Sequence, residues 1–275
     1  MSGVNKMQKL KQTMQLIGLA FIILGLTGCI SATGQQDIHQ RIESEDEPVV
    51  RWGVKADTKL FGLYDIPSQE IVGFDVDIAK ALTEVMTHGK GTAELVEVNS
   101  KTRIPLLKNG NIDAIIATMS ITPDRQKMVD FSDVYFAAGQ SLLVAEKSDI
   151  QGIDSLTAEH VVLAIKGSTS AQNIREAAPQ VTVLEMENYS EGFIALQSGQ
   201  GDALTTDNAI LLGMVALNPG YRLAGDVFVD EPYGIAIDKK QDNFREAVNE
   251  ALETIQANGT YDAIYDKWFD GLMGQ

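Results

Sequence analysis

The chain has 275 residues, of which 44% are hydrophobic, so it holds enough apolar material for one large domain or two modest ones. Its formal net charge at pH 7 is −16. Because a polyanion is bound by basic surface, this acidity argues against a nucleic-acid partner, but it says little about a small ligand.

The first 28 residues have the organisation of a secretory signal. Three lysines and no acidic residue precede the apolar run Leu16–Leu26. This run is too short to span a bilayer and is typical of a signal-peptide core. The only cysteine, Cys29, follows in a Leu-Thr-Gly-Cys sequence that resembles a bacterial lipoprotein processing box. We expect removal of residues 1–28, lipidation of Cys29 as a membrane anchor, and a mature chain of net charge −19 without an internal disulfide.

Residues 29–47 are polar and end in the acidic run Glu43–Glu47. Such a composition cannot bury enough apolar surface to compensate the entropy lost on ordering. We therefore expect residues 29–47 to form a flexible tether between the lipid anchor and the folded part of the chain.

From residue 48 onward, strand-like and helix-like segments alternate, which indicates an α/β architecture. Between residues 74 and 86, for example, Val76, Ala79, Leu82 and Val85 recur at helical spacing. Strands are expected at residues 49–55, 93–98, 112–118, 161–165, 181–186 and 202–206, and helices at residues 74–86, 103–108, 170–178, 190–198, 208–216, 242–257 and 260–269.

A short internal repeat indicates two similarly built lobes. The pattern Gly-x-x-Asp-Ala occurs at Gly110–Ala114 and again at Gly199–Ala203. In both places an apolar helix is expected to end at a glycine and a strand to begin. The repeat is short enough to arise by chance, so it supports two lobes without requiring them.

Residues 118–125 combine hydroxyl groups with an arginine at a predicted helix start. Pro123 suits the first helical position, and Thr122 before it suits the N-cap. Arg125 then lies beside unpaired backbone N–H groups, where a guanidinium can hold a carboxylate through two parallel hydrogen bonds. The hydroxyls of Thr118 and Ser120 are expected at the same end. Taken alone, the segment also fits a capped helix with a surface arginine.

Six motifs occur in order along the chain: Gly73–Leu82, Ile112–Ser132, Lys166–Ser170, Gly201–Ala203, Glu231–Gly234 and Gly259–Asp262. In sequence, order and spacing they resemble those of the polar amino-acid substrate-binding proteins of ABC transporters, the bacterial extracellular solute-binding protein family 3. The resemblance covers the chain from about residue 49 to residue 268. It is greatest with glutamine/glutamate-type members from Gram-positive bacteria.

The resemblance implies a two-lobed α/β fold of the type II periplasmic-binding-protein kind, in which the chain crosses between the lobes twice. Lobe 1 would comprise residues 48–137 and 232–275, and lobe 2 residues 138–231. The crossings would fall near Tyr135–Gly139 and Val229–Tyr233. In such sheets the ligand lies beyond the carboxyl ends of the strands.

A free amino acid presents a carboxylate and an ammonium, so its binding site needs a cation and an anion that face each other. Arg125 is the predicted carboxylate partner on lobe 1, with Ser120 completing its hydrogen bonds. The family's ammonium-binding acid falls on Asp207 of lobe 2, although Asp207 also suits the N-cap of the following helix. Ser168 and Thr169 open the first helix of lobe 2 and would add an anion-binding terminus, besides capping it.

The residues that select the ligand's side chain are harder to predict. Many family members carry an aromatic residue before the helix at 103–108, where this chain has Ser100 and then Arg103, a pattern similar to members that bind acidic side chains. Lys55 also matches a basic position in some of these members, but a surface lysine is an equally good explanation. Glutamate and glutamine both remain open.

No cofactor, metal or catalytic centre is predicted. The three histidines have no metal-ligand spacing, and the chain has no P-loop and no nucleophile elbow. The predicted function is capture of a polar amino acid outside the cytoplasm and its delivery to an ABC permease. Two alternatives use the same fold: a periplasmic cyclohexadienyl dehydratase-like enzyme, and a ligand-loaded sensor that docks on a receptor.

Overall fold

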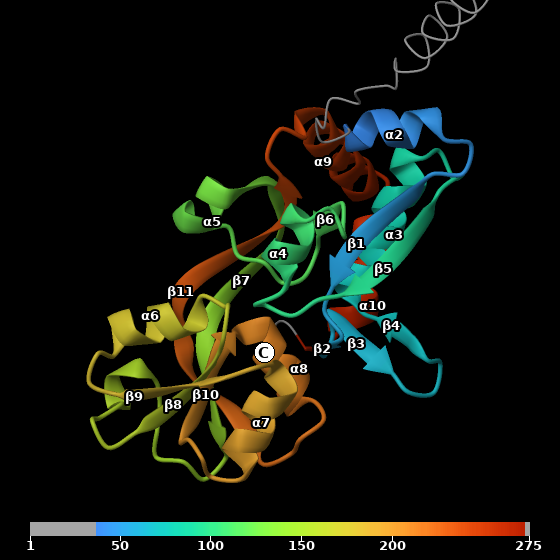
Figure 1. Ribbon diagram of the computed structural model, residues 1–275. Helices are drawn as coiled ribbons and strands as arrows, with labels where there is room; N and C mark the ends of the chain where they lie inside the picture. Colours follow the sequence, from blue (N-terminus) through green and yellow to red (C-terminus); the bar gives the residue numbers. More distant parts are fainter. Residues whose placement is uncertain (1–36, 273–275) are drawn as a thin grey trace, which may run out of the picture. The chain divides into compact units, whose positions relative to one another are not determined.

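The computed structural model describes residues 37–272 (Figure 1). Its central feature is an eight-stranded sheet built around two long strands, β7 (Val129–Ala145) and β11 (Tyr221–Asp238). These strands pair with each other antiparallel, and the pairing shifts register on both sides of the Val229–Tyr233 segment. The segments expected as crossings, Tyr135–Gly139 and Val229–Tyr233, pair with each other in the middle of this ladder.

Three parallel strands extend the sheet on each side of the long pair. Beyond β11 they are β6 (Ala114–Ile115), β1 (Val49–Val54) and β5 (Thr92–Glu97). Beyond β7 they are β10 (Ala203–Asp207), β8 (Val161–Ile165) and β9 (Thr182–Met186). The two halves therefore share one continuous sheet, and only β7 and β11 belong to both.

Each half of the sheet is covered by its own helices (Figure 1). In the first half the helices pack on one another and on β1, β5 and β7; they are α3 (Phe74–Met86), α9 (Asp242–Ala257) and α10 (Thr260–Phe269). In the second half they pack on β8, β9 and β10; they are α6 (Ser170–Ala177), α7 (Tyr189–Gln197) and α8 (Asn208–Val215). The short helices α4 (Arg103–Lys108), α5 (Pro123–Met128) and η1 (Ile153–Ser155) lie in connections.

Most predicted elements are confirmed within one residue at either end, including α3, α4, α9 and α10. The strand predicted at residues 112–118 is much shorter, because only Ala114–Ile115 joins the sheet. Thr118 has a φ of +45°, far from the values of regular β-strand. A small three-stranded sheet was not predicted; its strands are β2 (Asp57–Thr58), β3 (Gly62–Asp65) and β4 (Glu70–Val72).

The predicted tether is wrong from residue 37 onward. Residues Ile38–Ser44 form a helix, α2, whose N-cap Asp37 accepts hydrogen bonds from two backbone amides of the first turn. Ile38 and Ile42 are buried in the main core, and Arg41 binds the buried carboxylate of Asp113 at 2.7 Å. Packing of α2 against the folded part therefore offsets the conformational entropy lost on ordering this segment. Its polar composition alone could not do so. Residues 29–36 and the predicted signal peptide and lipidation site lie outside the described residues.

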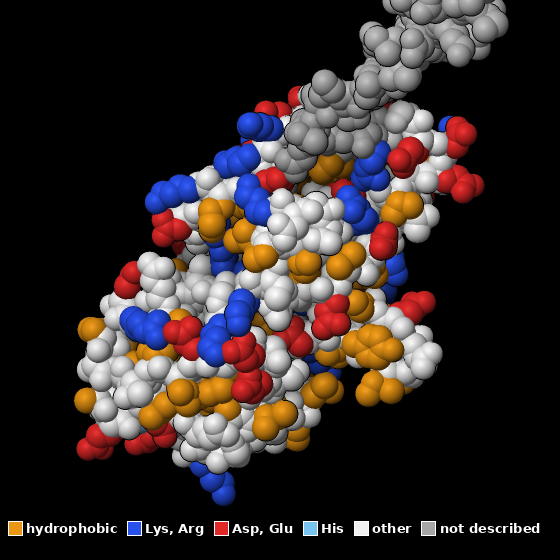
Figure 2. All heavy atoms as spheres, viewed as in Figure 1, with side chains coloured by type: hydrophobic (Ala, Val, Ile, Leu, Met, Phe, Trp, Pro, Cys, Tyr) orange, Lys and Arg blue, Asp and Glu red, His pale blue; other side chains and the backbone are white. Residues whose placement is uncertain are grey.

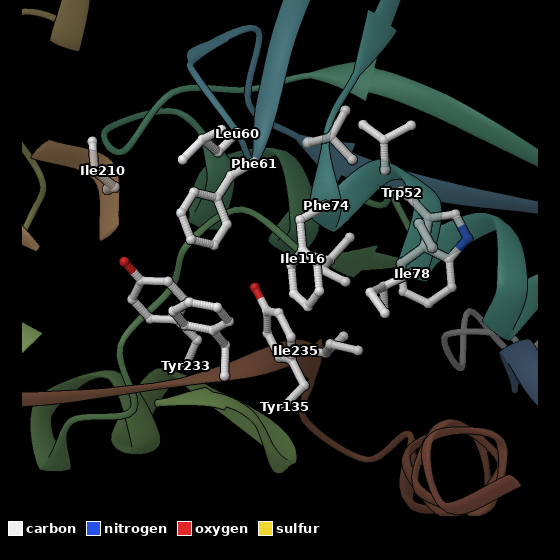
Figure 3. Close-up of a cluster of buried hydrophobic side chains, with 14 of the residues drawn as sticks. Trp52, Leu60, Phe61, Phe74, Ile78, Ile116, Tyr135, Ile210, Tyr233 and Ile235 are labelled. Carbon is white, nitrogen blue, oxygen red and sulfur yellow. The ribbon is translucent and has the colours of Figure 1, made fainter. Parts of the chain in front are cut away.

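The core at the centre of the molecule is a cluster of aromatic rings (Figure 3). Phe61 lies 5.1 Å from Phe136 and 5.8 Å from Tyr233, centroid to centroid, and Phe74 lies 5.2 Å from Phe269. Edge-to-face and tilted contacts of this kind add to the large apolar area that each ring buries. Because Phe136 and Tyr233 come from β7 and β11, the core holds the middle of both long strands.

Within residues 37–272, no helix has the length and apolar character needed to cross a membrane. The same residues contain no group of three or more histidine, cysteine, aspartate or glutamate side chains placed to hold a metal ion.

Candidate ligand-binding site

Arg125 is buried where the two halves of the molecule meet. The predicted helix start is confirmed: Pro123 begins α5 and the Thr122 hydroxyl accepts a hydrogen bond from the Arg125 amide at 3.2 Å. The Arg125 side chain is only 7% exposed; it donates to the Ser120 carbonyl at 2.8 Å and to the Gly167 carbonyl at 3.2 Å. Gly167 follows β8, so Arg125 contacts both halves. It is not a surface arginine.

Thr118 and Ser120 lie beside Arg125 in a strained loop. Both side chains are buried, and Ser120 forms a backbone bridge with Tyr233 of β11. Thr118 adopts the left-handed backbone region, which a β-branched residue rarely does. Its Oγ1 atom is buried without a hydrogen-bond partner among the described residues. Backbone strain and an unpaired hydroxyl in one residue are typical of a ligand-binding position.

Asp207 ends β10 and carries an unpaired carboxylate oxygen. Its Oδ2 accepts a hydrogen bond from the Tyr233 hydroxyl at 2.5 Å, and its Oδ1 is buried with no partner within residues 37–272. Asp207 is the N-cap residue of α8, yet its side chain makes no capping bond, so capping does not explain it. Burial, together with the nearby Glu231, raises the pKa of Asp207 to about 7, whereas Tyr233 and the two cleft arginines lower it. A cationic donor would form a hydrogen bond with Oδ1 and would stabilise the negative charge of the Asp207 carboxylate.

Lys55 is fully buried at the end of β1, which rules out the surface lysine considered from sequence. Its Nζ donates to Ser100 Oγ at 2.7 Å and lies 4.7 Å from the centre of the Tyr189 ring. Burial, together with the charges of Arg103 and Arg125, lowers the pKa of Lys55 to about 7, although Asp57 and Asp207 oppose the shift. No carboxylate in the described part of the chain forms a salt bridge with it, so a hydrogen-bond acceptor from a ligand would complete its environment.

Arg103 is also buried, but one nitrogen of its guanidinium is hydrogen-bonded to the protein backbone. Its Nη1 donates to the Ala117 carbonyl at 2.6 Å and to the Thr118 carbonyl at 3.3 Å, while its Nε has no partner in the described residues. Burial lowers the pKa of Arg103 to about 9. The side chain thus supports the Thr118 loop as well as adding positive charge beside Lys55.

Ser168 and Thr169 lie at the start of α6, as predicted, with different hydrogen bonding. Ser168 Oγ donates to the Ile165 carbonyl at 2.6 Å and accepts from the Ser170 amide at 3.2 Å. Thr169 is the N-cap residue, but its side chain makes no capping bond. A pocket runs from this helix start to Arg125, and its lining from both halves includes Ser100, Arg125, Gly167, Thr169, Asn173 and Glu231.

The arrangement places cations and anions together in a buried space. Among the described residues, Arg125 binds carbonyl oxygens and Asp207 binds the Tyr233 hydroxyl, so neither has the hydrogen-bonded ion pair that usually accompanies burial of a charge. A zwitterion would supply both missing partners. The surface view in Figure 2 shows acidic and basic side chains mixed on the visible face, with no large basic patch there.

A family of known proteins has the same sequence pattern across most of this chain. The match to the bacterial extracellular solute-binding proteins, family 3, spans residues 50–271. The chain belongs to this family. As a solute-binding protein of this family it functions outside the cytoplasm, and its relatives are binding components of ABC transporters rather than enzymes.

Two curated relatives of this solute-binding protein are bacterial glutamine-binding proteins. The ABC transporter glutamine-binding protein GlnH of Bacillus subtilis is 52% identical over 263 residues, which cover 93% of this chain and 96% of the relative. The glutamine-binding protein of Geobacillus stearothermophilus is 56% identical over 192 residues, covering 70% of this chain and 73% of the relative. A glutamate-binding protein of Corynebacterium efficiens is 34% identical over 247 residues, covering 86% and 83%.

Solved structures confirm the two-lobed α/β fold. An ancestral arginine-binding protein bound to glutamine is 41% identical, with a TM-score of 0.76 over 80% of this chain and 97% of the other. An ancestral amino acid-binding protein, described as a precursor of cyclohexadienyl dehydratase, is 33% identical, with a TM-score of 0.77 over 84% and 99%.

Several residues of the site in this solute-binding protein were not predicted from its sequence. Tyr189 lies over Lys55, Tyr233 binds Asp207, and Glu231 has a buried Oε2 without a partner among the described residues. Aromatic residues in apolar surroundings are usually core, so nothing in the sequence distinguished Tyr189 from core residues. Glu231 and Tyr233 lie in the motif Glu231–Gly234, which was the one available signal.

Proposed function

We propose that this protein captures free glutamine between its two lobes and delivers it to the permease of an ABC transporter. Two buried ionisable groups support this proposal: Arg125, which binds only carbonyl oxygens within residues 37–272, and Asp207, whose Oδ1 has no partner there. Glutamine is preferred over other amino acids because two relatives that align with most of this chain are named for it.

In this proposal Arg125 binds the α-carboxylate, and the start of α6 at Ser168 and Thr169 adds backbone N–H groups and a favourable helix dipole. Asp207 Oδ1 accepts a hydrogen bond from the α-ammonium. The Thr118 hydroxyl and Ser120 fill the remaining hydrogen-bonding positions. Each of these residues is buried or lines the pocket in the structure.

The ligand's side chain would meet Lys55, Ser100 and Arg103. Lys55 donates one hydrogen bond to Ser100, which leaves other donors for the carbonyl oxygen of a carboxamide. Burial lowers the pKa of Lys55 to about 7, and a carboxamide oxygen can accept its hydrogen bond without a charged partner. A ligand carboxylate would favour the charged form of Lys55, so glutamate is the strongest competitor.

Lobe 1 would comprise residues 48–137 and 232–275, and lobe 2 residues 138–231, with the middle of β7 and β11 as the hinge. Cys29 would carry the lipid that anchors the protein to the outer face of the cell membrane. In a Cys29→Ser variant, lipid attachment and signal cleavage should both fail. Mass spectrometry of the membrane fraction tests this, since an unmodified Cys29 in the wild-type protein would contradict the anchor.

Titration calorimetry of the purified protein with glutamine, glutamate, aspartate, asparagine, arginine and histidine tests the ligand assignment. We expect glutamine to bind most tightly and glutamate next. Lys55→Met separates the two, because it should weaken binding of both ligands but reduce the affinity for glutamate more. Tighter binding of arginine or histidine, or no binding of any of these amino acids, would refute the assignment.

A further inference from the structure

Thr118 is held in an unfavourable conformation at a position that faces the proposed ligand. Its φ of +45° and its unpaired, buried Oγ1 were described above. A threonine leaves this backbone region readily, because its branched side chain is crowded there. Neighbouring groups must therefore fix the backbone on both sides of it.

Two buried side chains do so. On the amide side, Asp75 Oδ2 accepts a hydrogen bond from the Thr118 N–H at 2.9 Å. Arg103 Nη1 donates to the Ala117 carbonyl, which is in the same peptide group as the Thr118 amide, and to the Thr118 carbonyl on the other side. Asp75 belongs to the first turn of α3 and is completely buried.

The second oxygen of Asp75 is bound to β7. Its Oδ1 accepts a hydrogen bond from the Tyr135 hydroxyl at 2.9 Å, and the Tyr135 carbonyl accepts one from the Tyr261 hydroxyl at 2.6 Å. Figure 3 shows Tyr135 in the aromatic core close to Phe74, the neighbour of Asp75. Both carboxylate oxygens are thus used inside the protein, so Asp75 is not a ligand-binding group.

We propose that Asp75 is a positioning residue that holds Thr118 in its left-handed conformation and links this ligand-facing loop to the hinge strand β7 through Tyr135. This inference rests on the proposed function, because it assigns Asp75 a share in ligand affinity. A buried acid that serves only folding is the competing explanation, and the two differ in what happens to the Thr118 amide.

A neutral side chain of the same shape can replace Asp75. Burial raises the pKa of Asp75 to about 7, although the bonds from Thr118 and Tyr135 and the charges of Lys55 and Arg103 lower it. The protonated, neutral form of Asp75 is therefore accessible near neutral pH. An asparagine would accept from the Thr118 amide through its oxygen and donate to the Tyr135 hydroxyl through its nitrogen.

The test is a double-mutant cycle with glutamine as the titrant in calorimetry. Asp75→Leu leaves the Thr118 amide without an acceptor and should raise the Kd at least about tenfold, whereas Asp75→Asn should stay within about threefold. Asp77→Leu is the matched control. It removes an acid from the same turn, and since Asp77 binds Lys267 and Trp268 instead, the Kd should not change.

Thr118→Gly supplies the decisive comparison, because glycine adopts a positive φ without support. In the Thr118→Gly background, Asp75→Leu should change the Kd by less than about threefold, since the strained threonine is no longer there to be held. An equal effect of Asp75→Leu in both backgrounds would overturn the proposal. If Asp75→Leu does not fold, Asp75→Ser replaces it, because the serine hydroxyl is too short to reach the Thr118 amide.

Hydrogen exchange of residues 114–122 in the ligand-free protein separates this proposal from the proposed function. Exchange at this segment should become faster in Asp75→Leu and remain slow in Asp75→Asn and Asp77→Leu. Failure of the wild-type protein to bind glutamine would refute the ligand assignment alone. Unchanged exchange in a folded Asp75→Leu protein would refute the positioning role, whatever ligand the protein binds.

Discussion

Arg125 is the residue whose loss should cost the most affinity. Arg125→Ala leaves the ligand carboxylate desolvated and unpaired, so the Kd for glutamine should rise by about a hundredfold to several thousandfold. Arg125→Lys should recover only part of the loss, because a point charge replaces a two-pronged donor. The measurement is calorimetry, with folding checked by circular dichroism.

Arg175→Ala is the matched control for Arg125. Arg175 lies on α6 in the other half of the molecule and forms an exposed ion pair with Glu185. Its loss should leave the Kd unchanged. Near-native affinity in Arg125→Ala would refute the role assigned to this arginine.

Lys55 should make the stability of the ligand-free protein depend on pH. Its pKa is lowered to about 7 in the folded state but returns to about 10.4 on unfolding. Between these values the unfolded chain binds more protons, so the free energy of unfolding rises with pH. The unfolding temperature of the wild type, relative to Lys55→Met, should therefore increase from pH 7 to pH 9. A difference that stays constant over this range would show that Lys55 titrates normally.

At the level of residues, the sequence predicted where the charges lie better than it predicted their environment. Arg125 and Asp207 were placed by motifs and by the ends of helices and strands, which are local features. Whether Lys55 is buried depends on Tyr189, which is distant in sequence. No local pattern contains that information.

Among the elements, α2 offers the clearest test of what tertiary contacts contribute. Arg41 donates to the Val49 carbonyl at 2.8 Å and binds Asp113, so it fastens the helix to β1 and to the chain beside β6. Arg41→Ala should lower the free energy of unfolding by about 1–3 kcal/mol and leave the Kd for glutamine unchanged. A glutamate-specific protease should then cut more rapidly after Glu43, Glu45 and Glu47.

The control for this prediction is Arg245→Ala. Arg245 pairs with Asp242 on the exposed surface of α9. Its removal should affect neither stability nor proteolysis, because exposed ion pairs contribute little. Equal cleavage of Arg41→Ala and the wild-type protein would show that other contacts suffice to hold α2.

Long periodic helices were predicted almost to the residue, whereas α2 and the β2–β4 sheet were missed. The reason is physical. A seven-residue helix is unstable alone and forms only because Ile38 and Ile42 find a core that the rest of the chain provides. The bent segment after β6 was mistaken for strand because its apolar residues suit a sheet, while its conformation follows from the bonds made by Asp75 and Arg103.

For the whole molecule, binding should involve closure of the lobes. The site is divided between them, and Tyr189 of α7 donates its backbone N–H to Asp57 of β2 at 2.9 Å. A ligand that touches both lobes favours the closed state by its differential affinity. Saturating glutamine should therefore reduce the radius of gyration in solution scattering.

Asp207→Ala should reduce both affinity and this compaction, because lobe 2 then loses its charged contact with the ligand. Asp202→Ala is the control, since Asp202 lies at the opposite end of the same strand and binds the Val161 amide. Tight binding without any change in the radius of gyration would refute closure as the mechanism.

The sharing of one sheet by both halves also sets an order for folding during export. β6 pairs on one side with β1 and on the other with β11, and α9 and α10, which cover α3, come after β11 in the chain. In a chain that emerges N-terminus first, the strands β8, β9 and β10 can therefore assemble with their helices before β11, the last strand of the first half, is available. The half that is synthesised first is therefore the half whose sheet is completed last, because β6 has only β1 as a neighbour until β11 has been made.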